Sequence, residues 1–144
     1  MRLVSALLLF LSLFLVGCGE SRSTDTSSAV FSSLEGKQAF LERYVNFRRS
    51  YEELAFHIFF SDGGGGMAPG PSEWDVRVFA TVREEELGEW ISGLKPVETA
   101  DTSWVAKIPG GPENVNSFEW FGESGRIVGI DRSGRRVLYR NWAF

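Results

Sequence analysis

The sequence predicts an α+β fold, a mainly antiparallel sheet of about six strands with two helices packed on one face. Three observations support this prediction. A length of 144 residues suggests a single domain, and 43% hydrophobic with 14% aromatic residues is enough for a core. Apolar residues recur at helical spacing in two segments only, and the other segments alternate or are continuously apolar. The helical and strand segments are segregated along the chain rather than regularly alternating, which favours α+β.

The first helix and the first two strands come early in this order. Ser32 stands three residues before Glu35, as a capping box requires, and the apolar spacing that follows predicts a helix over 34–50. Residues 54–60 are apolar on both faces, so they should form a central strand. Residues 74–82 alternate and predict a strand with one buried face.

A second helix and a series of hairpins should follow. The second helix is predicted over 83–94, with three glutamates in its first turn, where the helix dipole favours negative charge. Its apolar stripe is Leu87, Trp90, Ile91 and Leu94. Glycine-containing turns at 122–125 and 132–134 are typical of hairpins. The remaining strands are expected at 103–108, 117–121, 126–131 and 135–140.

The first residues have the pattern of a signal peptide. One positive charge, Arg2, precedes an apolar run of fourteen residues, 3–16. As a helix this run would reach roughly 21 Å, which is short of the ~30 Å hydrocarbon core of a bilayer. The run therefore predicts a cleaved signal rather than a transmembrane helix.

The residues that end this run, Leu15, Val16, Gly17 and Cys18, resemble the lipobox of bacterial lipoproteins. The resemblance covers residues 1–18 only and implies cleavage between Gly17 and Cys18, with thioether diacylglycerol on Cys18 and usually a further acyl chain such as palmitate. Two or three chains make a stable membrane anchor. An ordinary secretory signal is the alternative, but no A-x-A-like site is visible near Gly17. Cys18 is the single cysteine, so an intramolecular disulfide is excluded.

The resemblance also suggests a location and a domain organisation. Gly19 stands where an aspartate commonly marks inner-membrane retention, so we expect the outer membrane, facing the periplasm, or the cell membrane in a single-membraned organism. Eight of the fifteen residues 19–33 are Ser or Thr, which predicts a flexible tether of roughly 20 Å. The expected organisation is a signal peptide at 1–17, a lipidated cysteine with its tether at 18–33, and one domain at 34–144.

The charge of the chain argues against nucleic-acid binding. Loss of Arg2 with the signal peptide changes the formal net charge from −4 to −5. Residues 126–144 carry five arginines against Asp131 alone, and these suit an acidic partner or anionic headgroups. Ion pairing within the domain is the alternative.

A glycine-rich stretch at 61–73 is the most unusual feature of the expected domain. It contains the four glycines Gly63, Gly64, Gly65 and Gly66, but Met67 and Ala68 follow where a phosphate-binding Walker loop needs a lysine and Ser or Thr. No cofactor is therefore predicted. A loop this long is uncommon unless it is functional or flexible, so it is either a binding loop for a protein or glycan or a disordered connector.

Ionisable residues near this loop are the candidates for chemistry. Asp62, Glu73 and Asp75 bracket the loop, but Ca²⁺ wants six to eight oxygens and no EF-type loop is present, so no metal site is predicted. A glycosidase-like acid pair is formally possible among the same three carboxylates. His57, the only histidine, is either an ordinary buried histidine or, if exposed, the first residue to test.

Together these observations predict a lipid-anchored, non-enzymatic binding module, and a periplasmic immunity or inhibitor protein is the narrower version by analogy of size and location. The alternative is a glycan- or cell-wall-directed hydrolase that uses Asp62, Asp75 and His57. The oligomeric state is left open, and the partner is an unidentified protein or glycan. The candidate binding residues are Asp62, Gly63, Gly64, Gly65, Gly66, Trp74, Arg132 and Arg136.

Overall fold

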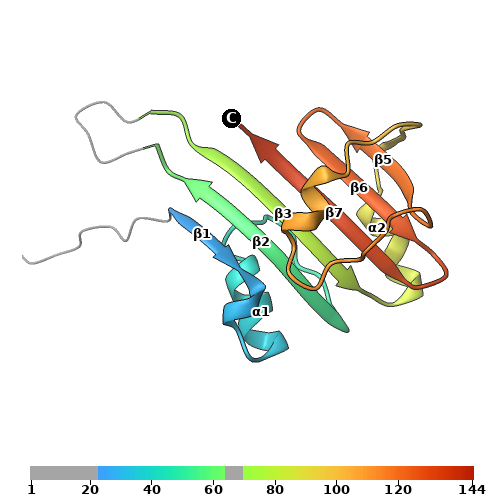
Figure 1. The fold of residues 1–144 in the computed structure, drawn as a ribbon, viewed down its shortest axis with the longest axis horizontal. Helices are drawn as coiled ribbons and strands as arrows, with labels where there is room; N and C mark the ends of the chain where they lie inside the picture. The colour runs from blue at the N-terminus through green and yellow to red at the C-terminus, as the bar shows by residue number, and fades with distance from the viewer. Residues whose placement is uncertain (1–22, 64–69) are drawn as a thin grey trace, which may run out of the picture.

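The structure of the protein, a computed structural model, describes residues 23–63 and 70–144. These residues form an antiparallel sheet with the strand order β1-β2-β3-β7-β6-β5-β4 (Figure 1). The α+β prediction is confirmed in its broad form, but the sheet has seven strands rather than about six. The strands are β1 (Thr24–Ser27), β2 (Glu53–Ser61), β3 (Glu73–Thr81), β4 (Lys95–Pro96), β5 (Glu119–Glu123), β6 (Arg126–Asp131) and β7 (Arg136–Ala143).

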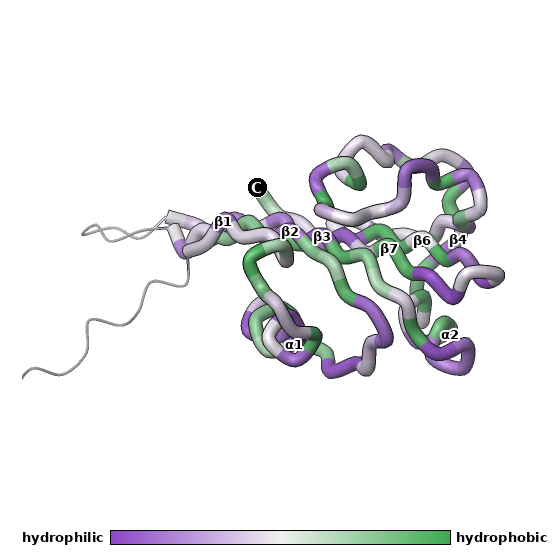
Figure 2. The backbone as a smooth tube through the Cα atoms, turned by 60° about the horizontal axis from the view of Figure 1, so that its bottom comes forward, coloured by the Kyte–Doolittle hydropathy of each residue, from purple (hydrophilic) through white to green (hydrophobic). Residues whose placement is uncertain are grey.

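Two short α-helices, α1 (Leu34–Leu41) and α2 (Leu87–Trp90), lie on one face of the sheet, which we call the helix face (Figure 2). Three short 3-10 helices, η1 (Ser28–Val30), η2 (Glu84–Glu86) and η3 (Ser103–Lys107), complete the described elements. Within residues 23–63 and 70–144, none of the helices is long and apolar enough to cross a membrane.

The main core lies between the helix face and the two α-helices. Alternate residues of the strands point to this face, so that Phe56 and Ile58 of β2 lie beside Val78 and Val76 of β3. Leu41 of α1 and Trp90 of α2 are buried against the same cluster. The alternation expected from the sequence therefore builds the larger core.

The opposite face, which we call the row face, is only partly covered. The chain between β4 and β5 crosses it and carries η3, which lies in front of β7 in Figure 1. Trp104, Val105 and Ile108 of this segment pack on Leu138 of β7 and form a second, smaller core. Toward the start of β3 the same face carries charged residues instead.

Both predicted helices are shorter than expected. The helix predicted over 34–50 ends at Leu41, and bonds from Arg43 N to Phe40 O and from Tyr44 N to Leu41 O turn the chain away. Phe47 lies beyond the helix and packs edge-on against Trp90, with 5.4 Å between the ring centroids. Its apolar side chain therefore packs on the core from an irregular segment and not from a helix. The capping side chain is Ser33 rather than Ser32, since the Ser33 hydroxyl accepts from Gly36 N at 3.0 Å.

The helix predicted over 83–94 is also reduced, to η2 and α2. Leu87 and Trp90 are buried as the predicted stripe requires, while Gly93 has a φ of +79° and lies beyond the helix. Positive φ is incompatible with a continuing right-handed helix. The apolar stripe was predicted correctly, and the helix length was wrong.

The strand predicted at 103–108 is the 3-10 helix η3. Asp101 initiates it, because its side chain accepts from Ser103 N at 3.0 Å and its carbonyl accepts from Trp104 Nε1 at 2.8 Å. Such local bonds offer the backbone an alternative to a strand. The strand predicted at 117–121 is displaced to β5, and the other four predicted strands are present with small changes at their ends.

The sheet begins inside the range expected to be a tether. Residues 24–27 form β1, which pairs with β2 from Thr24↔Phe60 to Ser27↔His57. The buried Ser28 hydroxyl then accepts from Phe56 N at 3.0 Å and fixes the chain beyond β1. Flexible coil is therefore wrong for these residues, and β1 and β4 raise the strand count.

The strand register defines two ends of the sheet. Trp74 of β3 lies opposite Phe60 of β2 and Ala143 of β7, and we call this end the proximal end. Thr81 of β3 lies opposite Glu53 and Arg136, and we call this the distal end. Seven residue steps along the strand separate Trp74 from Thr81, a distance of about 23 Å.

Candidate functional site

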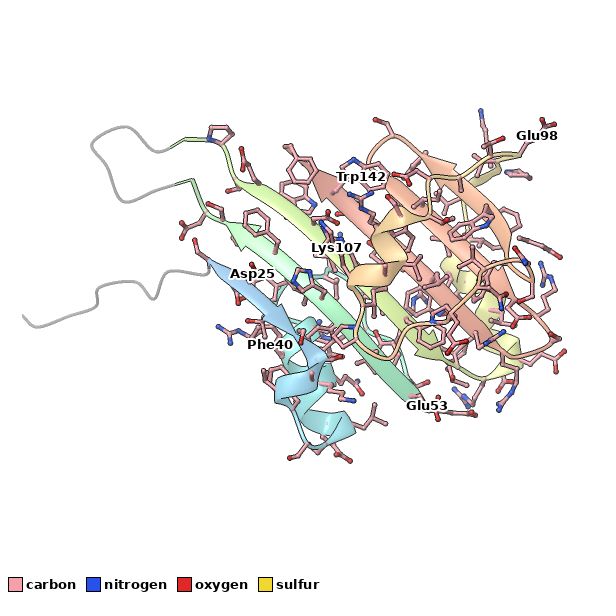
Figure 3. The ribbon with its side chains drawn as sticks, in the orientation of Figure 1. Asp25, Phe40, Glu53, Glu98, Lys107 and Trp142 are labelled. Carbon is pink, nitrogen blue, oxygen red and sulfur yellow. The ribbon has the colours of Figure 1, made fainter. Side chains whose placement is uncertain are left out.

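Ionisable side chains and one tryptophan form a continuous row across four adjacent strands on the row face. Asp25 on β1 and Trp142 on β7 lie at its two ends (Figure 3). The row runs from the edge of the sheet to its centre. Its members, in spatial order, are Asp25, His57, Arg77, Asp75, Arg140 and Trp142.

The histidine is at the centre of the first half of the row. His57 Nε2 lies 2.8 Å from Asp25 Oδ1, and His57 Nδ1 lies 2.6 Å from Arg77 Nη1. A guanidinium N–H only donates, so Nδ1 must accept and the ring proton is assigned to Nε2, which donates to Asp25. This geometry assigns a neutral histidine with both ring nitrogens engaged.

The carboxylate of Asp75 is at the centre of the second half. Arg140 Nε donates to Asp75 Oδ1 at 3.0 Å and Arg140 Nη2 donates to Oδ2 at 2.9 Å. Arg77 Nη2 donates to the same Oδ2. The guanidinium of Arg140 also lies 4.6 Å from the ring centroid of Trp142. The carboxylate therefore holds two arginines in fixed positions, and one of them stacks on an indole ring.

Burial differs along the row. Asp75 is 1% and Arg77 is 6% exposed, whereas the side chain of Asp25 is 70% exposed and that of His57 is 23% exposed. Charges are buried at low cost only when they are paired, and the two carboxylates here balance the two arginines. The row is therefore electrically neutral, with a buried centre and accessible ends.

A cavity of about 520 Å³ opens on the helix face at the proximal end. Its aromatic walls include Tyr44 and Trp74, and the indole Nε1 of Trp74 donates to Asn141 Oδ1 at 2.7 Å. Asn141 in turn donates to Gly125 O at 3.0 Å, so the indole is locked in place. We call it the proximal cavity. It is lined by Arg43, Tyr44, Val45, Asn46, Phe60, Trp74, Val76, Glu123, Arg126, Tyr139 and Asn141.

Ionisable groups give the proximal cavity a mixed character. Arg126 Nη2 lies 2.6 Å from Glu123 Oε1, while its Nε is buried and has no hydrogen-bond partner among the described residues. Burial raises the pKa of the Tyr139 hydroxyl above its ordinary value. Glu123 and Arg126 also line a smaller cavity of about 280 Å³ on the row face, beside Arg140 and Trp142. The proximal end is thus hollowed on both faces.

The predicted binding residues do not lie together. Asp62 and Trp74 lie at the proximal end, where the Ser23 hydroxyl donates to Asp62 Oδ1 at 3.1 Å. Arg136 lies opposite Thr81 at the distal end, and Arg132 lies in the turn before it. A single partner contacting all of these residues would have to span the length of β3.

A backbone hydrogen bond joins the two described ends of the glycine-rich stretch. Gly70 N donates to Gly63 O at 2.7 Å, and Gly63 has a φ of +72°. A Cβ added at Gly63 would lie 2.1 Å from Gly70 O, so only glycine fits. Gly64, Gly65 and Gly66 lie outside the described residues, as do the predicted cleavage and lipidation residues Gly17 and Cys18.

The distal arginines pair with acidic residues of the same domain. Arg136 Nε donates to Asp131 Oδ2 at 2.7 Å, and Arg132 lies 3.5 Å from Glu119. Burial acts to raise the pKa of Asp131, but hydrogen bonds from Ser133 and Arg136 outweigh it and leave this pKa below the ordinary value. Arg132 and Arg136 thus form ion pairs within the domain, which the sequence allowed as the alternative to an acidic partner.

The three residues proposed for hydrolysis are likewise not assembled into one site. His57 and Asp75 share the row, but the Arg77 guanidinium lies between them. Asp62 is bonded to Ser23 at the proximal end. The structure brings two of the three residues into one network and leaves the third outside it.

Residue patterns alone did not place Asp25, Arg77 or Arg140 beside His57 and Asp75. The alternation over 74–82 does place Asp75 and Arg77 on one face, which was the available signal. Because β1 was not predicted, nothing placed Asp25 beside His57. Arg140 becomes a neighbour of Arg77 only through the pairing of β3 with β7, which sequence spacing does not reveal.

Within residues 23–63 and 70–144, no group of three or more His, Cys, Asp or Glu side chains could hold a metal ion. Comparison of the chain with known protein families, curated proteins and solved structures finds no match.

Proposed function

We propose that this protein is a lipid-anchored protein of the cell envelope, and that its domain is a non-enzymatic binding module which recognises a macromolecule through the charged row. The observation that carries the proposal is the row itself. Its buried centre holds Arg140 and Trp142 in fixed positions, and its ends at Asp25 and Trp142 are accessible.

The fixed positions of the side chains in the row are the physical reason for preferring a binding function to catalysis. Arginine and tryptophan are enriched among residues that dominate binding energy at interfaces. Side chains already held in place lose less conformational entropy on binding. Asp75 holds Arg140 in place through two hydrogen bonds to its carboxylate. The guanidinium of Arg140 then lies beside Trp142 and the smaller cavity.

The same geometry gives less support to a glycan- or cell-wall-directed hydrolase. A general base needs a lone pair within reach of the substrate proton. Both ring nitrogens of His57 and both oxygens of Asp75 are already engaged by neighbouring side chains. The carboxylate of Asp62 is separate from them and accepts from Ser23.

The anchor part of the proposal is supported by the sequence. The apolar run, small residue and cysteine at 3–18 have the order of a lipoprotein signal. We infer acylation of Cys18, including palmitate, and location at the outer membrane facing the periplasm, or at the cell membrane of a single-membraned organism. A periplasmic immunity or inhibitor protein is the narrower form of this proposal, with a protein as partner. A glycan partner is the other outcome.

Chemical crosslinking of the full lipidated chain in intact cells, followed by affinity capture, tests the binding surface. We expect Trp142→Ala to reduce recovery of specifically crosslinked partners severalfold, because it removes the stacking partner of Arg140. The matched control is Arg132→Ala, an exposed distal residue whose loss should leave recovery unchanged. A third variant with the stretch 63–66 shortened tests the glycine-rich loop separately.

Three outcomes distinguish the hypotheses. Equal recovery with Trp142→Ala and Arg132→Ala would contradict recognition through the row. Loss of recovery only with the shortened loop would move the site to the loop. Release of soluble fragments from purified cell-wall material by the wild-type protein, abolished in Asp62→Asn, would favour the hydrolase instead.

A further inference from the structure

The chain leading to the proposed anchor joins the domain at the proximal end. Ser23 is fixed there by two hydrogen bonds, since its hydroxyl donates to Asp62 Oδ1 at 3.1 Å and accepts from Asp62 N at 3.2 Å. Only five residue steps separate Ser23 from Cys18, and a fully extended chain of that length spans at most about 18 Å. A lipid on Cys18 therefore keeps the proximal end close to the bilayer.

The proximal end carries aromatic side chains of the kind that favour a membrane interface. Phe144, which follows β7, is 77% exposed, and Trp74 nearby is half-buried. Rings with one apolar and one polar side are enriched where membranes meet water. Arg43 and Arg126 at the proximal cavity have long apolar stems and can keep their charges at headgroup level.

The distal end carries several surface ion pairs. Arg135 and Glu52 form an ion pair of 2.8 Å there, and Arg49 and Glu89 form another of 2.6 Å. The three consecutive glutamates of η2 are close by, and in Figure 3 Glu53 marks this end, away from Trp142. A surface of charged, hydrated groups is costly to bring against lipid. The two ends of the sheet are thus suited to different surroundings.

We propose that the proximal end of the sheet docks on the membrane surface, with Phe144 and Trp74 at the level of the lipid headgroups. This inference rests on the proposed lipid anchor, and it adds that the folded domain itself contacts the bilayer. The distal end then points into the aqueous space, and the row lies on a side of the domain that a partner can reach. Exposed acidic residues at the same end, Asp62 and Glu73, favour zwitterionic over anionic lipid.

Tryptophan fluorescence of the full lipidated protein in phosphatidylcholine vesicles tests this contact. The vesicles contain lipid brominated in the upper part of its acyl chains, which quenches only nearby indoles. We expect quenching relative to unbrominated vesicles, and we expect the Trp74→Phe variant to lose more than half of the emission that is quenched in wild type. Trp104→Phe is the control, because Trp104 is 2% exposed in the second core.

A second pair of variants separates docking from general hydrophobicity. Phe144→Ala should lower the quenched fraction, whereas Val30→Ala should not, although Val30 is 72% exposed and Phe144 is 77% exposed. Val30 ends η1, beyond the distal end of β1. Vesicle-bound protein whose tryptophans are not quenched would overturn the docking proposal alone. Protein that does not sediment with the vesicles when it is isolated from cells would overturn the anchor itself.

Discussion

Asp75 illustrates how one residue can organise a surface. Its carboxylate accepts from both Arg77 and Arg140, and its own exposure is only 1%. Without that carboxylate two guanidinium groups would face each other across neighbouring strands, since Arg77 lies opposite Arg140 in the register. The position of the accessible members of the row therefore depends on a side chain that a partner would not touch.

Replacement of Asp75 by asparagine should destabilise the domain strongly. Removal of one member of a buried ion pair leaves uncompensated charge and costs about 3–5 kcal/mol. Urea unfolding of Asp75→Asn measures this loss. The control is Glu123→Gln, which removes an exposed partner of Arg126 and should cost at most about 1 kcal/mol. Equal free energies of unfolding for the two variants would contradict a structural role for the centre of the row.

Asp131 should make the stability of the domain depend on pH. Hydrogen bonds from Ser133 and Arg136 hold its pKa in the folded state below the ordinary value of 3.8, despite the opposing effect of burial. A carboxylate whose folded pKa is depressed contributes its stability above the unfolded pKa, and this contribution is lost as the pH falls through the folded pKa. We expect wild type to exceed Asp131→Asn in unfolding free energy at about pH 7, with the difference shrinking below about pH 4. A difference that is constant across this range would contradict the linkage.

At the scale of elements, hydrophobic periodicity predicted burial better than it predicted backbone conformation. Leu87 and Trp90 are buried as expected, yet the helix around them is short. Trp104 and Val105 are buried, but they lie in a 3-10 helix and not in the predicted strand, because Asp101 accepts a local hydrogen bond from Ser103 N. Apolar side chains must be buried in either conformation, so their pattern alone does not determine which one forms.

The candidate site was less predictable than the strands that carry it. Residues 54–60 and 74–82 were predicted as strands, and His57 and Asp75 were singled out on them. The network between them also needs β1, whose Ser- and Thr-rich sequence has no apolar pattern because it lies at the edge of the sheet. Long-range strand pairing and an edge strand held by backbone bonds leave little trace in the sequence.

The packing of β6 against β5 provides a test of the second core. A Cβ at Gly129 would lie 2.8 Å from Cζ3 of Trp120, so Gly129→Ala must displace the indole. Overpacking of this kind costs about 1–3 kcal/mol, measurable by thermal or urea unfolding. The matched control is Gly88→Ala in α2, where no atom lies within 4 Å and alanine should be neutral or stabilising. A neutral Gly129→Ala would show that the indole has room to move.

At the scale of the whole molecule, the two ends and the two faces of the sheet have separate roles in the proposed arrangement. The helix face supplies most of the core, and the row face supplies the recognition surface. The proximal end, joined to the anchor through Ser23, carries aromatic rings, while the distal end carries ion pairs. An anchored domain with this polarity would present its row to partners in the space beside the membrane.

Intact-mass measurement of the mature protein, purified from cells in detergent, tests the anchor on which this arrangement depends. We predict a chain that begins at Cys18 and carries the added mass of a diacylglycerol and a further acyl chain. Radiolabelled palmitate should enter wild type and be absent from Cys18→Ser. A mature chain that begins elsewhere, or an unmodified Cys18, would contradict the lipid anchor and with it the proposed orientation of the domain.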